Sequence, residues 1–216
     1  MKIFRKKAVI VGSGGQGKVV LDILSHSRYR VIGFIDDNKE NIGKEMNGIK
    51  VIGTFDDLKE KRFSENVIIA IGNNATRAAK FKECADLGFC MINAIHPKAV
   101  ISRNASIGSG VVIMPGAIVN TNSRIGDDVI INTNASVDHD NVLEDHCQIQ
   151  PGAVLAGTVI VREYATVGSG ATVIPNKTIG RESVVGAGAV VVKDIADGMT
   201  VIGVPAEDIT MRKKIK

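Results

Sequence analysis

Tryptophan is absent from the 216-residue sequence, and aromatic residues make up only 4% of it. Surfaces that bind nucleic acid often stack the bases on aromatic side chains, so this composition disfavours a nucleic-acid-binding protein. The net charge of +4 is also small, and much of the excess lies in the terminal stretches MKIFRKK and MRKKIK. These stretches predict solvated tails and no basic binding face.

Cysteine is scarce as well, because Cys84, Cys90 and Cys147 are the only three and their spacing matches no metal-ligand motif. An odd number of cysteines without such spacing predicts reduced thiols in the cytosol and no bound metal. No apolar run approaches the length of a membrane span, and the N-terminus has no apolar region ahead of a small-residue cleavage site. We therefore expect a soluble, cytoplasmic protein.

Glycine, by contrast, is abundant, and a cluster of it follows the first apolar run in AVIVGSGGQGKVVLDIL, residues 8–24. Periodicity predicts a buried strand over 7–11 and a helix over 16–27. The same alternation continues with strands at 29–38, in IKVIGTFDDL, at 65–74 and in FCMIN, and with helices after Thr54 and over about 75–87. It predicts a first domain, residues 1–95, with a small Rossmann-like parallel sheet and crossover helices.

The carboxyl ends of these predicted strands carry residues that could bind a ligand. They hold the glycine turn, Asp36 with Asp37, and the Gly72-Asn73-Asn74 segment, and ligands of parallel sheets bind at this edge. Glycines let the backbone approach a phosphate, and free amides at a helix start attract an anion. Asp36 lies about 20 positions later, where an acidic residue could bind a ribose hydroxyl. The G-x-G-x-x-G pattern alone does not separate a dinucleotide from a nucleotide sugar, or either from a tight turn.

A six-residue repeat dominates the second domain, residues 96–216. Every sixth residue from Ile101 to Val191 is aliphatic, and four residues after most of them the side chain is small. One large and one small inward position in each hexapeptide predict a left-handed parallel β-helix of about five triangular coils over 101–191. Glycine, asparagine and aspartate are expected at its corners. Cys147 falls at a small inward position and is predicted to fill the core instead of acting as a nucleophile.

Several stretches in combination point to a family. The repeat is followed by VVVKDIADGMTVIGVPAE, and a similar G-V-P-A segment ends many hexapeptide acyltransferases. With VGSGGQGKVVLDIL, GFIDDN, AIGNN, NAIHPKAVIS and NASVDHDNVLEDHCQIQPGA, the chain resembles the NeuD/PglD-type sugar acyltransferases of bacterial glycan synthesis over nearly its whole length. The resemblance implies acetyl transfer from acetyl-CoA to the 4-amino group of a nucleotide-linked 4-amino-4,6-dideoxy sugar. It also implies a homotrimer with acetyl-CoA between neighbouring β-helices.

His139 is the histidine whose position suits catalysis. It follows the inward Val137 by two residues, which predicts an outward position at a coil corner between Asp138 and Asp140. Neighbouring carboxylates favour the imidazolium and raise the basicity of the ring. A base near neutrality suits removal of a proton from an attacking amine or hydroxyl. The resemblance places the family's base on His139 and its assisting acid on Asp140.

The resemblance also implies binding residues in both domains. Nucleotide-sugar contacts would fall on Gly14, Gly15, Gln16, Asp36, Asp37 and Gly72, and cofactor contacts on Gln148, Ser169 and Ala187. Two of these positions depart from the family pattern, because Gln16 and Gln148 stand where the family usually has histidine. Glutamine can donate a hydrogen bond but cannot titrate. These two departures affect the expected contact to the acceptor's phosphate and the expected polarisation of the thioester.

Three other functions stay open. O-acetylation of a sialic acid or another nine-carbon sugar would use the same base. A nicotinamide-dependent oxidoreductase would leave the repeat unexplained, and the predicted sheet, ending near residue 92, is about half of a full dinucleotide fold. A non-catalytic scaffold or nucleotide sensor would leave the His139 corner unexplained. His26 and His96 are expected to be structural or exposed, and His146 offers no convincing metal site.

Overall fold

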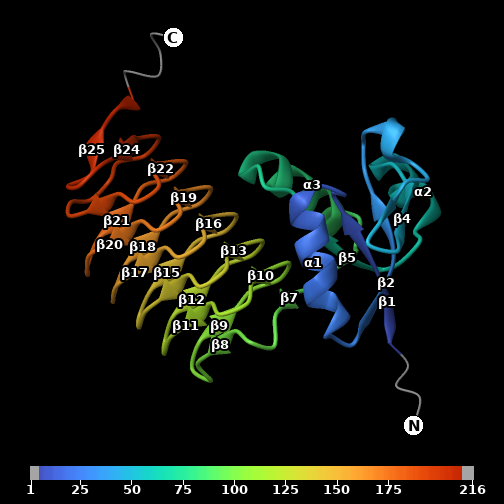
Figure 1. The fold of residues 1–216 in the computed structure, drawn as a ribbon, viewed down its shortest axis with the longest axis horizontal. Coiled ribbons are helices and arrows are strands. Elements are labelled where there is room, and N and C mark those ends of the chain that lie inside the picture. Colours follow the sequence, from blue (N-terminus) through green and yellow to red (C-terminus); the bar gives the residue numbers. More distant parts are fainter. Residues whose placement is uncertain (1–4, 211–216) are drawn as a thin grey trace. The chain divides into compact units, whose positions relative to one another are not determined.

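The computed structural model describes residues 5–210, so most of the two predicted solvated tails lies outside the described residues. Two compact units make up the chain, Met1–Pro97 and Lys98–Lys216. Figure 1 shows a sheet with helices in the first unit and a stack of short strands in the second.

A six-stranded, mainly parallel sheet forms the first unit. Its strands are β1 (Lys6–Val11), β2 (Tyr29–Ile35), β3 (Glu45–Met46), β4 (Ile49–Gly53), β5 (Asn66–Ile69) and β6 (Cys90–Met91). Their order is β3-β4-β2-β1-β5-β6, and only the β3–β4 pair is antiparallel among these strands. The other elements are α1 (Gly15–Ser25), η1 (Lys39–Asn41), α2 (Phe55–Lys61), α3 (Asn74–Asp86) and β7 (Ala94–Ile95). The predicted parallel sheet with crossover helices is confirmed.

Side-chain caps account for two of the helix starts. The Thr54 hydroxyl accepts a hydrogen bond from the amide of Asp57, whose carboxylate accepts one from the Thr54 amide at 2.9 Å. The Asn73 side chain accepts a hydrogen bond from the amide of Thr76 at 2.9 Å at the start of α3. Each contact satisfies an amide that the first helical turn leaves unpaired.

Two strands end earlier than the sequence predicts. β2 ends at Ile35 and β5 at Ile69, whereas the predicted strands run to residues 38 and 74. After β2, the Asp36 carboxylate accepts the amide of Asn38 at 2.9 Å and turns the chain out of the sheet. After β5, the cap on Asn73 begins α3. These segments therefore form loops at the carboxyl edge of the sheet.

The second unit is a parallel β-helix with three flat faces, as predicted. The first face contains β8 (Val100–Ile101), β11 (Ile118–Val119), β14 (Ser136–Val137), β17 (Val154–Leu155), β20 (Thr172–Val173) and β23 (Val190–Val191). The second contains β9 (Ser106–Ile107), β12 (Arg124–Ile125), β15 (Val142–Leu143), β18 (Ile160–Val161) and β21 (Thr178–Ile179). The third contains β10 (Val112–Ile113), β13 (Ile130–Ile131), β16 (Gln148–Ile149), β19 (Thr166–Val167), β22 (Val184–Val185), β24 (Thr200–Ile202) and β25 (Glu207–Asp208).

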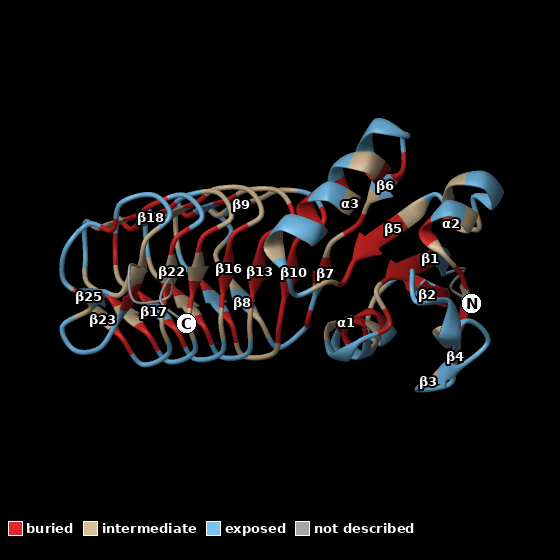
Figure 2. Ribbon diagram, turned by 90° about the horizontal axis from the view of Figure 1, so that it is seen from above, coloured by how far each residue is buried: buried red, intermediate tan, exposed pale blue. Residues whose placement is uncertain are grey.

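Each coil advances by 18 residues, so the predicted aliphatics stack on one another inside the prism. Val119 pairs with Val137, and Val137 pairs with Leu155. From Ile113 to Val191 the stacked aliphatics are buried, and Figure 2 shows the buried residues along the strands with exposed residues at the turns. Cys147 is fully buried in this core, which confirms its predicted role as filler. The continuous apolar stack is the main stabilising feature of the repeat.

The coil corners require a left-handed backbone conformation at one residue each. Asn122 and Asp140 adopt φ values of 59° and 58° at successive turns between the first and second faces. Asparagine and aspartate tolerate this conformation better than other non-glycine residues because their short polar side chains bond locally. The expected corner composition is thus confirmed at these positions, although His146 and Tyr164 adopt positive φ as well.

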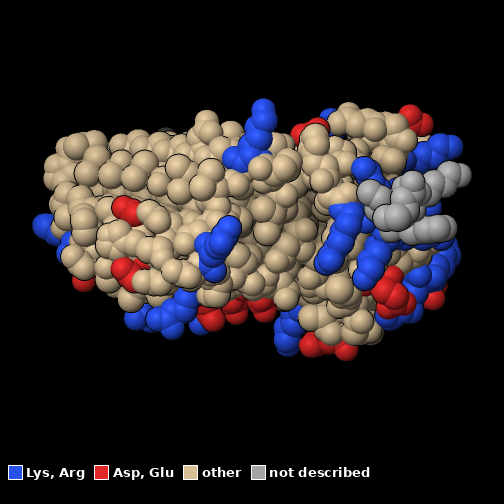
Figure 3. Space-filling view, turned by 90° about the horizontal axis from the view of Figure 1, so that it is seen from below, with Lys and Arg blue, Asp and Glu red and all other residues tan. Residues whose placement is uncertain are grey.

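Surface charge and helix length agree with the composition. On the face shown in Figure 3, the Lys, Arg, Asp and Glu side chains over the repeat are scattered and of both signs. Within residues 5–210, every helix is too short or too polar to cross a membrane.

Candidate active site

The glycine turn after β1 has two kinds of glycine. A Cβ atom added to Gly12 would lie 2.6 Å from the carbonyl oxygen of Ala70, and Gly12 has a φ of 104°. One added to Gly17 would lie 2.1 Å from the carbonyl oxygen of Gly12. Gly14 and Gly15 instead face open space, with no heavy atom within 4 Å of such a Cβ. Gly12 and Gly17 therefore close the turn, while Gly14 and Gly15 leave the backbone accessible at the start of α1.

A cavity of about 370 Å³ lies over this turn at the carboxyl edge of the sheet. The six residues predicted to bind the nucleotide sugar all line it: Gly14, Gly15, Gln16, Asp36, Asp37 and Gly72. The structure thus brings together segments that follow β1, β2 and β5. The amides at the start of α1 make the cavity suitable for an anionic group such as a phosphate.

The two aspartates hold the loops of the cavity in place. Asp36 accepts hydrogen bonds from the Ser13 amide, at 3.1 Å, and from the Ser13 hydroxyl, so it connects the loop after β2 to the glycine turn. Asp37 accepts the Phe55 amide at 3.0 Å and pairs with Lys80 at 2.8 Å. Burial raises the pKa of both carboxyls, but their hydrogen bonds have the larger combined effect. With bonds from Ser13 to Asp36 and from Lys80 to Asp37, each pKa lies below its ordinary value. Both groups are therefore negatively charged at neutral pH.

Three polar side chains that line this cavity are not among the residues predicted from the sequence. Ser13 anchors Asp36, and Thr76 and Lys80 lie on α3 and line the cavity. Their spacing of four places them on one helix face, a signal that could be used once α3 is assigned. Lys80 lines the same cavity while it pairs with Asp37.

Gln16 has a buried hydrogen-bond donor that a ligand in the cavity could satisfy. It lies in the first turn of α1, and no hydrogen-bond partner for its buried Nε2 atom lies among the described residues. A buried amide donor without a partner is costly, so a bound acceptor atom would stabilise it. The glutamine that replaces the family's histidine can thus still donate a hydrogen bond into this cavity.

The two kinds of glycine predict different effects of the same substitution. Gly17→Ala places Cβ against a backbone carbonyl and should lower the midpoint of thermal unfolding by about 5 °C or more. Gly15→Ala, the matched control, meets open space and should leave the midpoint within about 1 °C of wild type while weakening nucleotide binding. Thermal unfolding and calorimetric titration with a nucleotide diphosphate measure both. Equal unfolding midpoints for the two variants would contradict this division.

In the second unit, His139 and Asp140 form a close pair at a corner between the first and second faces. His139 Nδ1 lies 2.8 Å from Asp140 Oδ2, and the two side chains are 52% and 48% exposed. The predicted outward position of His139 is confirmed. With the Nδ1 proton directed at the carboxylate, Nε2 is the nitrogen available as a base. The hydrogen bond to Asp140 raises the pKa of His139, and the charge of Asp138 adds to this increase.

Side chains of the preceding coil and of the coil interior hold the His139–Asp140 corner in place. Asn122, 18 residues before Asp140, donates its Nδ2 to Asp140 Oδ1 at 3.1 Å. Inside the coil, Ser123 and Asn141 both donate to the carbonyl oxygen of Asp138, at 2.6 Å and 2.9 Å. No sequence motif marks these residues, although Asn122 lies one 18-residue coil before Asp140. The corner is therefore preorganised by side chains from two coils.

Asp140→Asn should lower both the pKa of His139 and the activity. The substitution removes the charge that bonds to Nδ1, so the His139 pKa falls toward its ordinary value. Because the neutral imidazole is the active base, the acidic limb of the pH–rate profile should move to lower pH, and the plateau rate should fall about tenfold to a hundredfold. Asp138→Asn should shift the limb less, because Asp138 bonds to the His139 amide and not to the ring. An unshifted profile for Asp140→Asn would contradict this assignment.

The predicted cofactor residues occupy other parts of the β-helix. Ser169 and Ala187 follow β19 and β22 and lie on successive coils at the corner between the third and first faces. Gln148 lies in β16 on the third face and is 5% exposed. The structure therefore brings Ser169 and Ala187 together but places neither them nor Gln148 at the His139 corner of the same chain.

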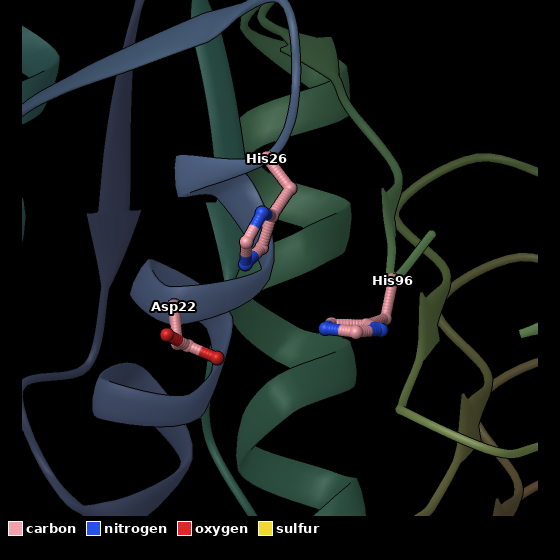
Figure 4. A group of neighbouring side chains, drawn as sticks. All are labelled: Asp22, His26 and His96. Atoms are coloured by element: carbon pink, nitrogen blue, oxygen red, sulfur yellow. The ribbon is translucent and has the colours of Figure 1, made fainter. Parts of the chain in front are cut away.

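The other histidines lie outside both regions. His146 is at the corner between the second and third faces, where its Nδ1 lies 2.9 Å from Asp128 Oδ2 and its ring stacks on Tyr164. Asp22, His26 and His96 form a group whose ligand-type atoms lie within 4.8 Å of one another, shown in Figure 4. The two imidazole rings of this group make an edge-to-face contact, with centroids 5.4 Å apart. None of these three lines the cavity over the glycine turn.

Comparison with known proteins identifies relatives of both units. Residues 7–84 match the PglD N-terminal domain, and residues 104–139 match the bacterial transferase hexapeptide (six repeats). UDP-N-acetylbacillosamine N-acetyltransferase of Bacillus subtilis (strain 168) is 41% identical over 116 residues. This stretch spans 50% of the chain and about half, 51%, of that curated relative.

Solved structures extend the similarity to nearly the whole chain. A variant of perosamine N-acetyltransferase from Caulobacter crescentus, in complex with CoA and GDP-perosamine, is 40% identical with a TM-score of 0.89, over 94% of this chain and 96% of that one. The chain belongs to the hexapeptide-repeat sugar N-acetyltransferases with a PglD-type N-terminal domain. Within this family, the acetyltransferase domain of PglB from Neisseria gonorrhoeae, in complex with acetyl coenzyme A, is also 40% identical with a TM-score of 0.89, over 95% and 100% of the two chains.

Family membership bears on the functions that the sequence leaves open. The predicted resemblance and the two-part fold are confirmed, and the relatives bind CoA or acetyl-CoA, as expected for the co-substrate. The named relatives are N-acetyltransferases of amino sugars. A nicotinamide-dependent oxidoreductase is not among these functions, and the glycine turn belongs to the PglD-type domain.

Proposed function

We propose that this protein transfers the acetyl group of acetyl-CoA to the 4-amino group of a nucleotide-linked 4-amino-4,6-dideoxy sugar, in the cytoplasm and for glycan synthesis. The observation that carries the proposal is the His139–Asp140 pair, with Nδ1 2.8 Å from the carboxylate and the ring half exposed. A basic, accessible imidazole of this kind suits deprotonation of an attacking amine.

The first domain, residues 1–95, would bind the nucleotide. Its phosphates fit the accessible amides at Gly14 and Gly15, and Gln16 Nε2 would donate to an acceptor atom of the ligand. Lys80 lines the same cavity and, besides its ion pair with Asp37, would donate a hydrogen bond to a ligand phosphate. Asp36, Asp37 and Gly72 would shape the binding site for the nucleoside, because the carboxylates already fix the surrounding loops.

The β-helix domain, residues 96–216, would carry out the transfer by direct attack. The sugar nitrogen bonds to the thioester carbonyl carbon while His139 Nε2 takes its proton, and the tetrahedral intermediate collapses with loss of the CoA thiolate. The thiolate then takes the proton from His139. A cysteine acyl-enzyme has little support, because Cys147 is fully buried and burial raises the pKa of the Cys84 thiol to about 12. Cys90 is exposed, but it lies on β6 of the first unit and not in the β-helix. Gln148, Ser169 and Ala187 would bind acetyl-CoA.

A homotrimer would unite parts of the site that one chain keeps apart. The first face separates the His139 corner from the corner with Ser169 and Ala187. Its outward side chains include Val100, Ile118 and Val154, which are 64%, 42% and 41% exposed. Exposed apolar side chains along a flat face favour burial against another protein surface. Neighbouring copies packed on this face would bring one chain's His139 toward another chain's cofactor corner.

Release of the CoA thiol across a panel of acceptors tests the proposal. The panel contains nucleotide-linked 4-amino sugars carrying uridine, guanosine or thymidine, their 4-hydroxy counterparts, and free sialic acid. We expect thiol release with at least one 4-amino sugar and none with its 4-hydroxy counterpart. Release with free sialic acid alone would favour a sugar O-acetyltransferase, and no release with any acceptor would favour a non-catalytic nucleotide-binding scaffold.

A further inference from the structure

Gly157 lies directly beside the imidazole of His139. The two residues are 18 positions apart and occupy equivalent places on successive coils, and the amide of Thr158 donates to the His139 carbonyl oxygen at 3.0 Å. A Cβ atom added to Gly157 would lie 2.4 Å from Cε1 and 2.5 Å from Nε2 of His139. These distances are far shorter than any non-bonded contact between heavy atoms, so the ring occupies the space that a side chain at this position would need.

The backbone gives no reason for glycine here. The glycines at other corners, such as Gly152 and Gly170, have φ values of 68° and 65°, which favour glycine. Gly157 is not among the residues of positive φ in the described chain. The equivalent position is Thr121 one coil before His139 and Pro175 one coil after Gly157. The fold of the coil therefore accommodates side chains at this position, and the need for glycine arises at His139.

We infer that Gly157 is a positioning residue for His139: its missing side chain lets the ring keep the orientation that bonds Nδ1 to Asp140, and leaves Nε2 open to the acceptor amine. The edge of the ring nearest Gly157 is the one that contains Nε2 and Cε1. A methyl group there would turn the ring away from Asp140 and cover the nitrogen that takes the proton. The inference rests on the proposed function only where it names the amine.

Gly157→Ala tests the inference by its effect on the ring. Because χ rotation of His139 relieves the contact at low cost, the variant should fold and bind acetyl-CoA as wild type does. Its kcat should fall about tenfold to a hundredfold, with a smaller change in KM for acetyl-CoA. The His139 pKa, followed by the NMR shift of its Cε1 proton, should fall toward its ordinary value as the Asp140 contact is lost. Pro175→Ala, the control at the equivalent position, should change neither quantity.

A double variant keeps the inference testable if Gly157→Ala is unstable. If the methyl group clashes with the imidazole, then His139→Ala combined with Gly157→Ala should restore the unfolding midpoint to that of His139→Ala alone. An unchanged His139 pKa together with a wild-type kcat would overturn the inference, and so would a loss of stability that persists without the imidazole. The NMR titration and the unfolding measurements need no acceptor, so their result stands apart from whether the proposed acceptor is correct.

Discussion

His139→Ala should reduce turnover of the nucleotide 4-amino sugar by about a thousandfold. General-base catalysis contributes a factor of about 10²–10⁴. Asp140, the neighbouring acid, is engaged with Nδ1 of His139 at 2.8 Å. The affinities for acetyl-CoA and for the nucleotide should stay within about twofold of wild type, because the proposed binding residues lie at other corners and in the other unit. Steady-state thiol release and calorimetric titration measure the two effects.

His146→Ala is the matched control for this variant. His146 also pairs with an aspartate at a coil corner, but its side chain is only 15% exposed and stacks on Tyr164. Its removal should lower the thermal midpoint and leave kcat close to that of wild type. If His139→Ala retained a rate within about threefold of wild type, the assignment of the base would be wrong.

Val154→Glu should disrupt the proposed trimer and remove activity with it. Val154 lies in the middle of the first face and is 41% exposed in the single chain. A carboxylate placed in a buried interface costs several kcal/mol, and about 3 kcal/mol corresponds to roughly a hundredfold loss in association. Sedimentation velocity should show smaller species at micromolar concentration, with acetyl-CoA binding and turnover reduced in parallel.

Ile160→Glu provides a control of equal chemistry on another face. Ile160 lies on the second face at a similar exposure, 37%, so the same substitution introduces the same charge away from the proposed interface. This variant should sediment as wild type does and keep its activity. A trimer that survives Val154→Glu, or dissociation caused equally by Ile160→Glu, would show that the first face is not the interface.

Strict periodicity made most of the fold predictable. The coils repeat every 18 residues without a slip, so Val137, Cys147 and Leu155 could be placed in the core by counting. In the first unit the main alternation of strands and helices was predictable, but η1 and β3 were missed. β2 and β5 also end early because Asp36 and Asn73 satisfy backbone amides outside the sheet. Such side-chain contacts leave no periodic signal.

The residues of the site could be predicted only where their chemistry and their position in one hexapeptide suffice. The exposed His139 beside Asp140 follows from its place after the inward Val137. Asn122 and Gly157 act from neighbouring coils, and their contribution appears only when residues 18 apart are stacked. For Gln16 the sequence shows that the side chain can donate a hydrogen bond, but only the structure shows that its Nε2 is buried with no partner among residues 5–210.

The structure of the reaction product tests the central claim most directly. Wild-type protein, acetyl-CoA and the 4-amino nucleotide sugar that releases most thiol should give a product whose proton NMR spectrum shows a new amide proton coupled to H4 of the sugar. His139→Ala, at the same protein concentration and time, should give almost none of it. An acetyl group found on a hydroxyl oxygen, or an equal yield of the amide from His139→Ala, would contradict N-acetylation at the His139 corner.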